Sequence, residues 1–229
     1  MNKVFNKKSA YIILSLLIFS VVVTLFDALV HPDYFTKILV KILFFLALPI
    51  VYLFLNKNAT VDFFRLFSFK KKGILQALLF GVFIYIIITG GFLLTRKMFD
   101  YSAVTMSLES GMGITKKNFL YVALYISILN SFLEEFFFRG FGFVLMKKYT
   151  TRIFAYVLSP VLFAIYHVGM TFSMFSIALL LIVMAGLFAG GVIFNYLNER
   201  NENIYSSWFC HMFANFAINT CGFILFNAV

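Results

Sequence analysis

The sequence predicts an all-α fold, a polytopic transmembrane helical bundle of about seven spans. Its 229 residues are 62% hydrophobic and only 12% charged, and 33 of them are phenylalanine. A soluble domain carries roughly 25% charged residues, so this composition excludes an ordinary globular protein. Apolar runs of about 20 residues, enough to cross a bilayer as a helix, recur along the chain. We therefore expect one integral membrane domain over residues 1–229.

Clusters of charged residues separate the apolar runs and define the expected spans. Each run can satisfy its backbone hydrogen bonds inside the bilayer as a helix. The first resembles a signal peptide, but its length and the lack of a small-residue cleavage site predict a retained anchor. The expected spans are residues 10–30, 38–55, 74–94, 118–146, 152–170, 174–197 and 204–227.

Two further segments carry structural expectations. Residues 61–72 mix aromatic side chains with terminal lysines, which predicts either an eighth, interfacial helix or an ordinary basic loop. In the sixth span, the small residues of segment 185–191 predict close packing against a neighbouring helix.

The distribution of lysine and arginine predicts the orientation. With a cytoplasmic N-terminus, most of the basic residues fall on the cytoplasmic side, as the positive-inside rule requires. We expect a multi-pass cell-membrane protein with its C-terminus outside, a net charge of +10 that attracts anionic lipid, and no nucleic-acid partner. The basic residues expected on the outer side are Lys37, Lys41, Arg96, Lys97, Lys116 and Lys117.

Two adjacent carboxylates, Glu134 and Glu135, lie inside the fourth expected span. Each costs roughly 2.5 kcal/mol or more at membrane depth, so both should be paired or border a water-filled cavity. Arg139 follows Glu135 by four residues and shares its helical face, which predicts an ion pair. Glu134 lies about 100° further round the helix, so it should face elsewhere and serve a different role.

Two histidines lie in later expected spans, each within a four-residue spacing that places two side chains on one helical face. These pairs are Phe163 with His167 and His211 with Asn215. At 1.5 Å per residue, the depths of Glu134, His167 and His211 fall within a band of about 8 Å. Three helices could therefore direct these side chains into one cavity.

Such a set suits peptide hydrolysis, which needs a base for water and donors for the developing oxyanion. Glu134 with His167 can act as the base, and His211 with Asn215 can supply the donors. Two histidines and one carboxylate are also a common catalytic zinc set, so Glu134, His167 and His211 could hold Zn²⁺. The sequence leaves the choice between these mechanisms, and thus the cofactor, open.

Three motifs in this order resemble the signatures of the CPBP family, the CAAX-processing and bacteriocin-processing intramembrane proteases also called Abi proteins. The resemblance covers about residues 118–220, the expected catalytic core. The motifs are Glu134-Glu135-x-x-x-Arg139, Phe163-x-x-x-His167 and His211-x-x-x-Asn215.

The resemblance implies an all-helical intramembrane endopeptidase, of either glutamate or metal type. It implies that Glu134 acts on water as the base with His167, while His211 and Asn215 polarise the scissile carbonyl. The supporting residues would be Glu135, Arg139 and Phe163.

The expected substrate is a small hydrophobic or membrane-anchored peptide or protein, and the expected roles are peptide maturation, signalling or bacteriocin self-immunity. A second hypothesis is a membrane immunity protein that binds without proteolysis, or a proton- or cation-coupled transporter, because buried Glu, His and Asn residues also serve ion pathways. Against it, the chain shows no repeat of two halves, and its polar residues cluster in the C-terminal half.

Overall fold

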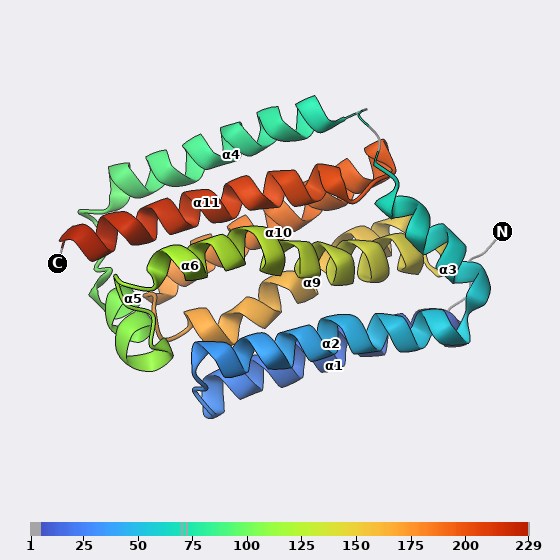
Figure 1. The fold of residues 1–229 in the computed structure, drawn as a ribbon, viewed down its shortest axis with the longest axis horizontal. Coiled ribbons are helices and arrows are strands. Elements are labelled where there is room, and N and C mark those ends of the chain that lie inside the picture. The colour runs from blue at the N-terminus through green and yellow to red at the C-terminus, as the bar shows by residue number, and fades with distance from the viewer. Residues whose placement is uncertain (1–5, 70, 72, 229) are drawn as a thin grey trace.

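The computed structural model describes residues 6–69, 71 and 73–228, and this part of the chain is almost entirely helical and contains no strand (Figure 1). Seven helical stretches among the described residues are long and apolar enough to cross a membrane, which confirms the predicted bundle. They are α1 (Lys7–Leu29), α2 (Tyr34–Leu55), α4 (Ile74–Thr95), the composite helix Phe119–Tyr149, α9 (Arg152–Thr171), α10 (Ile177–Asn201) and α11 (Tyr205–Ala228).

Two helices begin a few residues before the expected apolar runs, because polar residues cap them. Asn6 and Ser9 form a capping box at the start of α1, and Asp33 caps α2. The early start of α2 places Lys37 inside this helix, together with Lys41, which already fell within the expected span 38–55 although the sequence analysis assigned its charge to the outer side.

A short additional helix, α3 (Lys57–Phe64), and a 3-10 turn, η1 (Arg65–Phe67), follow α2. They confirm an extra helix near the expected segment 61–72, of which residues 70 and 72 lie outside the described residues. Phe63 is fully buried, and its ring lies 2.9 Å from the point where Gly140 would carry a Cβ atom. This helix is therefore docked on the bundle through an aromatic contact.

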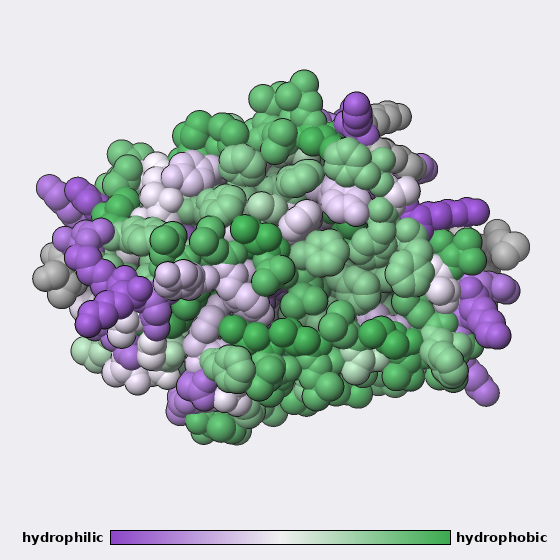
Figure 2. All heavy atoms as spheres, in the orientation of Figure 1, coloured by the Kyte–Doolittle hydropathy of each residue, from purple (hydrophilic) through white to green (hydrophobic). Residues whose placement is uncertain are grey.

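The bundle places α4 and α11 at one edge and the α1–α2 pair at the other, with the composite helix, α9 and α10 between them (Figure 1). Its core is aromatic, and Phe19, Phe45, Phe137 and Tyr166 pack together without exposure to solvent. Hydrophobic residues cover the middle of the surface, and hydrophilic residues gather at the two ends (Figure 2). This distribution is the one that a multi-pass membrane protein requires.

Close helix packing depends on particular glycines. A Cβ atom on Gly169 would collide with the backbone of Thr24 in α1, and one on Gly191 would lie 2.7 Å from the Cβ of Pro160 in α9. By contrast, Gly186 has open space around it. The predicted packing of segment 185–191 is therefore made at its end, by Gly191, rather than along the whole small-residue stretch.

The loop between α4 and the composite helix closes one end of the bundle. It contains α5 (Ser102–Met106) and the π-helical turn η2 (Ser107–Gly111). Beyond these turns, Met112 and Ile114 are buried against Phe119, Met174 and Phe226. The end of the bundle beside the C-terminus thus has a small apolar core of its own.

Candidate active site

The composite helix that carries both predicted carboxylates does not wind uniformly. Its two stretches of π-helix are wider than an α-helix, and such turns occur frequently at functional sites. A wider turn also reduces the angle between successive side chains, so adjacent residues can reach a common partner. Along the chain the segments are α6 (Phe119–Leu124), π-helical η3 (Tyr125–Asn130), α7 (Ser131–Glu134), π-helical η4 (Glu135–Leu145) and α8 (Met146–Tyr149).

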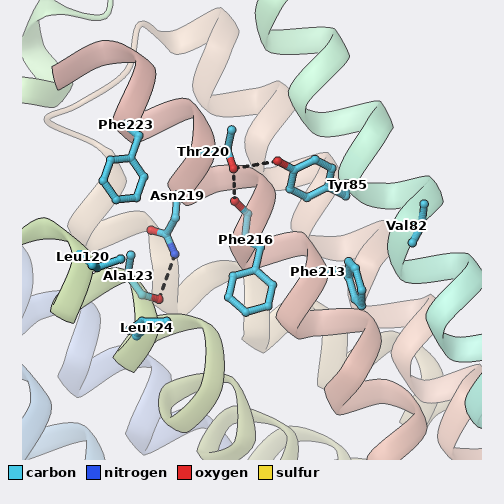
Figure 3. Close-up of a pocket in the computed structure, with 10 residues that line it drawn as sticks. All are labelled: Val82, Tyr85, Leu120, Ala123, Leu124, Phe213, Phe216, Asn219, Thr220 and Phe223. Carbon is cyan, nitrogen blue, oxygen red and sulfur yellow. Dashed lines mark hydrogen bonds between the residues drawn. The ribbon is translucent and has the colours of Figure 1, made fainter. Parts of the chain in front are cut away.

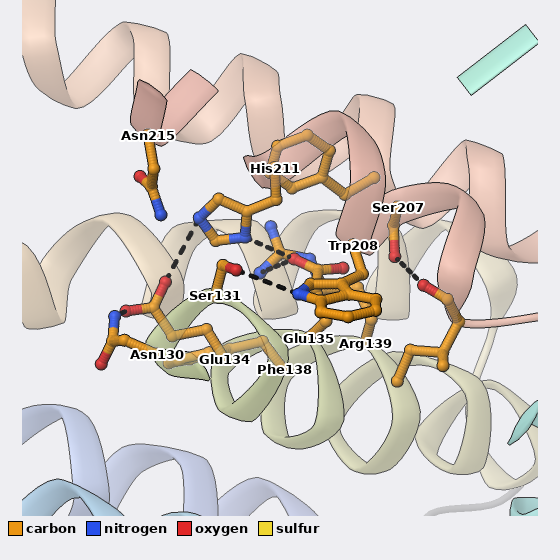
Figure 4. Close-up of polar contacts among 12 residues, drawn as sticks. Asn130, Ser131, Glu134, Glu135, Phe138, Arg139, Ser207, Trp208, His211 and Asn215 are labelled. Carbon is orange, nitrogen blue, oxygen red and sulfur yellow. Dashed lines mark hydrogen bonds and ion pairs between the residues drawn. The ribbon is translucent and has the colours of Figure 1, made fainter. Parts of the chain in front are cut away.

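Glu134 is only 2% exposed, and each of its two carboxylate oxygens has a different environment. The amide of Asn130 donates to Oε1 at 2.5 Å, and the hydroxyl of Tyr166 donates to the same oxygen. Oε2 lies 3.4 Å from Nε2 of His211 (Figure 4). One oxygen is thus held by two donors, whereas the other faces the histidine.

His211 contacts both glutamates. Its Nδ1 lies 2.9 Å from Oε1 of Glu135, and its Nε2 faces Glu134 (Figure 4). The predicted ion pair between Glu135 and Arg139 is present at 3.5 Å. However, the expectation that Glu134 and Glu135 face different surroundings was wrong, because both contact the ring of His211. The π-helical winding and the approach of α11 bring this ring between the two carboxylates.

Arg139 is fully buried between two aromatic rings. Its guanidinium carbon lies 4.1 Å from the centre of the Phe163 ring and 5.0 Å from that of Phe194. Among the described residues, its nitrogens form no hydrogen bond, so the cation is stabilised by Glu135 and by the faces of the two rings. Phe194 also stacks on His211 at a centroid distance of 4.9 Å, which extends the same packing to the site.

His167 lies beside this cluster but is not hydrogen-bonded to Glu134. Its Nδ1 is 2.8 Å from the main-chain oxygen of Phe163 and must donate to it, because a carbonyl can only accept. Its ring packs against Tyr166 at 4.0 Å between centroids. Tyr166 thus lies between Glu134 and His167, and among the described residues no hydrogen bond is found at Nε2 of His167. The predicted joint action of Glu134 and His167 on water remains a prediction.

Asn215 lies one turn after His211 on α11, and its amide donates to the main-chain oxygen of Ile126 at 3.1 Å. The other donors from α11 behave alike: Asn219 binds the oxygen of Ala123, and Trp208 binds that of Ile128. Backbone carbonyls buried in a protein need partners, and these three donors meet carbonyls in or next to the first π-helical stretch. Asn215 thus holds this stretch in place and does not contact the glutamates.

Three residues of this cluster were not predicted from the sequence. Asn130 carried a usable signal, because it precedes Glu134 by four residues on the same face. Tyr166 directly precedes His167, but nothing in its position indicated that its hydroxyl would reach the carboxylate. Phe194 is one phenylalanine among 33 and carried no signal at all.

The described residues contain no group of three or more His, Cys, Asp or Glu side chains arranged to hold a metal ion. Nε2 of His211 lies 3.4 Å from Glu134, and His167 stands outside this contact. The described side chains therefore lack the three converging ligands that the zinc hypothesis over Glu134, His167 and His211 requires.

A cavity of about 380 Å³ lies apart from the glutamates, between α4, α6 and α11 (Figure 3). Its lining is mostly apolar. The polar groups at its wall are Asn219 and the hydrogen-bonded pair of Tyr85 and Thr220, whose oxygens are 2.9 Å apart. The cavity shares α11 with His211, but none of the predicted site residues lines it.

The fold and the buried cluster define a multi-pass helical membrane protein with paired carboxylates and a histidine inside its bundle. Residues 116–217 match the family model described as type II CAAX prenyl endopeptidase Rce1-like. This match is consistent with the CPBP family of intramembrane proteases that the three motifs resemble, and that family implies protease activity. Searches of curated proteins and of solved structures found no match.

Proposed function

We propose that this protein is a glutamate-type intramembrane endopeptidase in which Glu134 is the catalytic base. The observation that carries this proposal is the asymmetric binding of its carboxylate, with two donors on one oxygen and Nε2 of His211 at 3.4 Å from the other. Two fixed donors restrict the rotation of the carboxylate, and a base that takes a proton from water must be oriented in this way. The catalytic core would span residues 118–220 within a single membrane domain, 1–229.

In the proposed reaction, a water molecule binds between Glu134 and the free Nε2 of His167. Glu134 takes one proton as the water oxygen attacks the carbonyl carbon of the peptide, and it returns this proton to the leaving amine when the carbon–nitrogen bond breaks. The scissile carbonyl oxygen, which becomes negative, accepts a hydrogen bond from Nε2–H of His211. Glu135 orients that ring through Nδ1.

Asn215 is the second proposed donor to the oxyanion. It lies on the same face of α11 as His211, one turn further on, and its amide binds the oxygen of Ile126. Donation to a substrate therefore requires that this hydrogen bond opens when the substrate enters. Arg139 and Phe163 support the site, because they fix Glu135 and pack beside both histidine rings.

The proposed substrate is a small hydrophobic or membrane-anchored peptide, because the site is enclosed by helices whose outer faces are apolar. We propose a role in peptide maturation, signalling or bacteriocin self-immunity, in a cell membrane with the N-terminus cytoplasmic and the C-terminus outside. The excess of basic residues on the N-terminal side of the membrane supports this orientation.

The test compares membranes from a deletion strain that expresses wild-type, Glu134→Gln or Glu109→Gln protein at equal levels. Glu109 is an exposed glutamate outside the long helices and serves as the matched control. Peptidomic analysis should find peptides cut in the wild type and the control but not in Glu134→Gln. Equal peptide patterns with intact protection or signalling would instead favour a non-proteolytic immunity protein or a transporter.

A further inference from the structure

Lys41 is a cation on α2 that points toward the proposed site. It is half-buried, and its Nζ lies 5.2 Å from the centre of the Tyr166 ring. The hydroxyl of that ring donates to Glu134. Tyr166 thus contacts the ammonium group of Lys41 through its ring face and Glu134 through its hydroxyl.

Lys37, one turn earlier on the same helix, has a different environment. It is buried and pairs with Asp27 of α1 at 3.4 Å. Among the described residues, Lys41 has no such ion pair, and its only close partner is the face of Tyr166. A cation within a membrane span persists where it is paired or where it lines a water-filled site that serves function. The structure thus leaves the ammonium group of Lys41 free to bind an anion.

Lys41 lies about two turns after the start of α2. A lysine at this position could extend its side chain toward the end of the helix and keep its ammonium group in water. Its position over Tyr166 shows that it turns inward. Glu134 does not need it as a hydrogen-bond donor, because Asn130 and Tyr166 already bind Oε1. The three donors of the ammonium group therefore remain available for a ligand.

We infer that Lys41 binds a carboxylate of the substrate peptide beside the scissile bond. The inference rests on the proposed function, since the site must hold a peptide, and it assigns part of the specificity to α2. This helix lies outside the segment that matches the protease family, residues 116–217. The N-terminal half would then select the substrate, while the C-terminal half carries the chemistry.

The experiment measures the binding of two probes to purified protein in lipid nanodiscs by isothermal titration calorimetry at pH 7. The probes are N-acetyl-trileucine with a free carboxylate and the same peptide as its carboxamide. A charge-assisted hydrogen bond should make the acid bind roughly tenfold more tightly than the amide to the wild type. Lys41→Gln should lose this preference, Lys41→Arg should retain it, and the exposed-lysine control Lys117→Gln should not change it.

Equal affinity of the wild type for both probes, or no binding of either, would overturn the inference. So would an acid preference that survives in Lys41→Gln. Failure of the proposed function gives a different result, because the peptidomic comparison of wild type and Glu134→Gln measures cleavage independently of probe binding. An acid preference without such cleavage would retain the binding site and reject the protease, whereas cleavage without acid preference would reject only the role of Lys41.

Discussion

Removal of the Tyr166 hydroxyl tests whether the orientation of Glu134 matters for catalysis. Tyr166→Phe keeps the ring, and with it the contacts to Phe19, Phe138 and His167, but deletes the donor to Oε1. The carboxylate then retains Asn130 as its only donor on that oxygen. We expect an intact fold and a slower reaction.

The size of the effect depends on the type of bond. A hydrogen bond to a charged group contributes roughly 1.5–3 kcal/mol, and each 1.36 kcal/mol on a barrier is a factor of ten in rate. If the transition state loses the whole contribution, kcat/KM should fall roughly 10- to 150-fold. Because Tyr166 remains packed in the aromatic core, thermal stability should change far less than activity.

The matched control is Tyr156→Phe. The Tyr156 hydroxyl also donates to a glutamate, Glu199, at 2.7 Å, but this pair joins α9 to the end of α10 away from the proposed site. Cleavage of the peptide identified by peptidomics should be measured in nanodiscs for both variants. Equal rates for Tyr166→Phe and Tyr156→Phe would refute the assigned role of Tyr166 in orienting the base.

The remaining predictions concern packing, metal and pH. Gly169→Ala should lower the free energy of unfolding by about 1–3 kcal/mol in thermal or denaturant unfolding, since its Cβ would meet the backbone of Thr24. The control Gly186→Ala should be nearly neutral, and equal effects of the two substitutions would contradict this packing. Prolonged chelation should leave cleavage unchanged, and loss of activity with recovery on addition of zinc would contradict the metal-free mechanism. The Thr36 hydroxyl and amide lower the pKa of Asp33 below its ordinary value of 3.8. The stabilisation by the Asp33 cap should therefore be complete above pH 3.8 and disappear as the pH falls through the lower folded-state pKa. The difference in unfolding free energy between wild type and Asp33→Ala should shrink on acidification, and a constant difference would contradict this assignment.

The bundle was predictable because membrane spans have a strong local signal. About 20 apolar residues between charges predict a helix whatever surrounds them, and all seven expected spans correspond to helices. The starts of α1 and α2 were missed because Asn6 and Asp33 are polar caps outside the apolar runs. Lys41 lay near the start of the expected span 38–55 and was assigned to the outer side, but its position over Tyr166 depends on packing between two helices and has no local signal.

The site was predictable only where its geometry is local. The pair of Glu135 and Arg139 is expected from a spacing of four residues on one helix. The contact of Glu134 with His211 depends on π-helical winding and on the approach of α11, neither of which periodicity shows. The choice of Tyr166 rather than His167 as the donor to Glu134 is likewise decided by packing between helices.

The π turn Tyr125–Asn130, whose main-chain oxygens accept hydrogen bonds from α11, determines how the composite helix responds to a change in its length. Relative to an α-helix, a π turn accommodates one extra residue without changing the direction of the helix that follows it. Deletion of one residue between Tyr125 and Asn130 should therefore restore regular winding there and leave Glu134 directed toward His211. Deletion of one residue between Ser131 and Leu133, in the regular turn of α7, would instead rotate Glu134 by about 100° and turn it away from His211. The tolerance of this helix to a change in length thus differs between two adjacent segments of the chain.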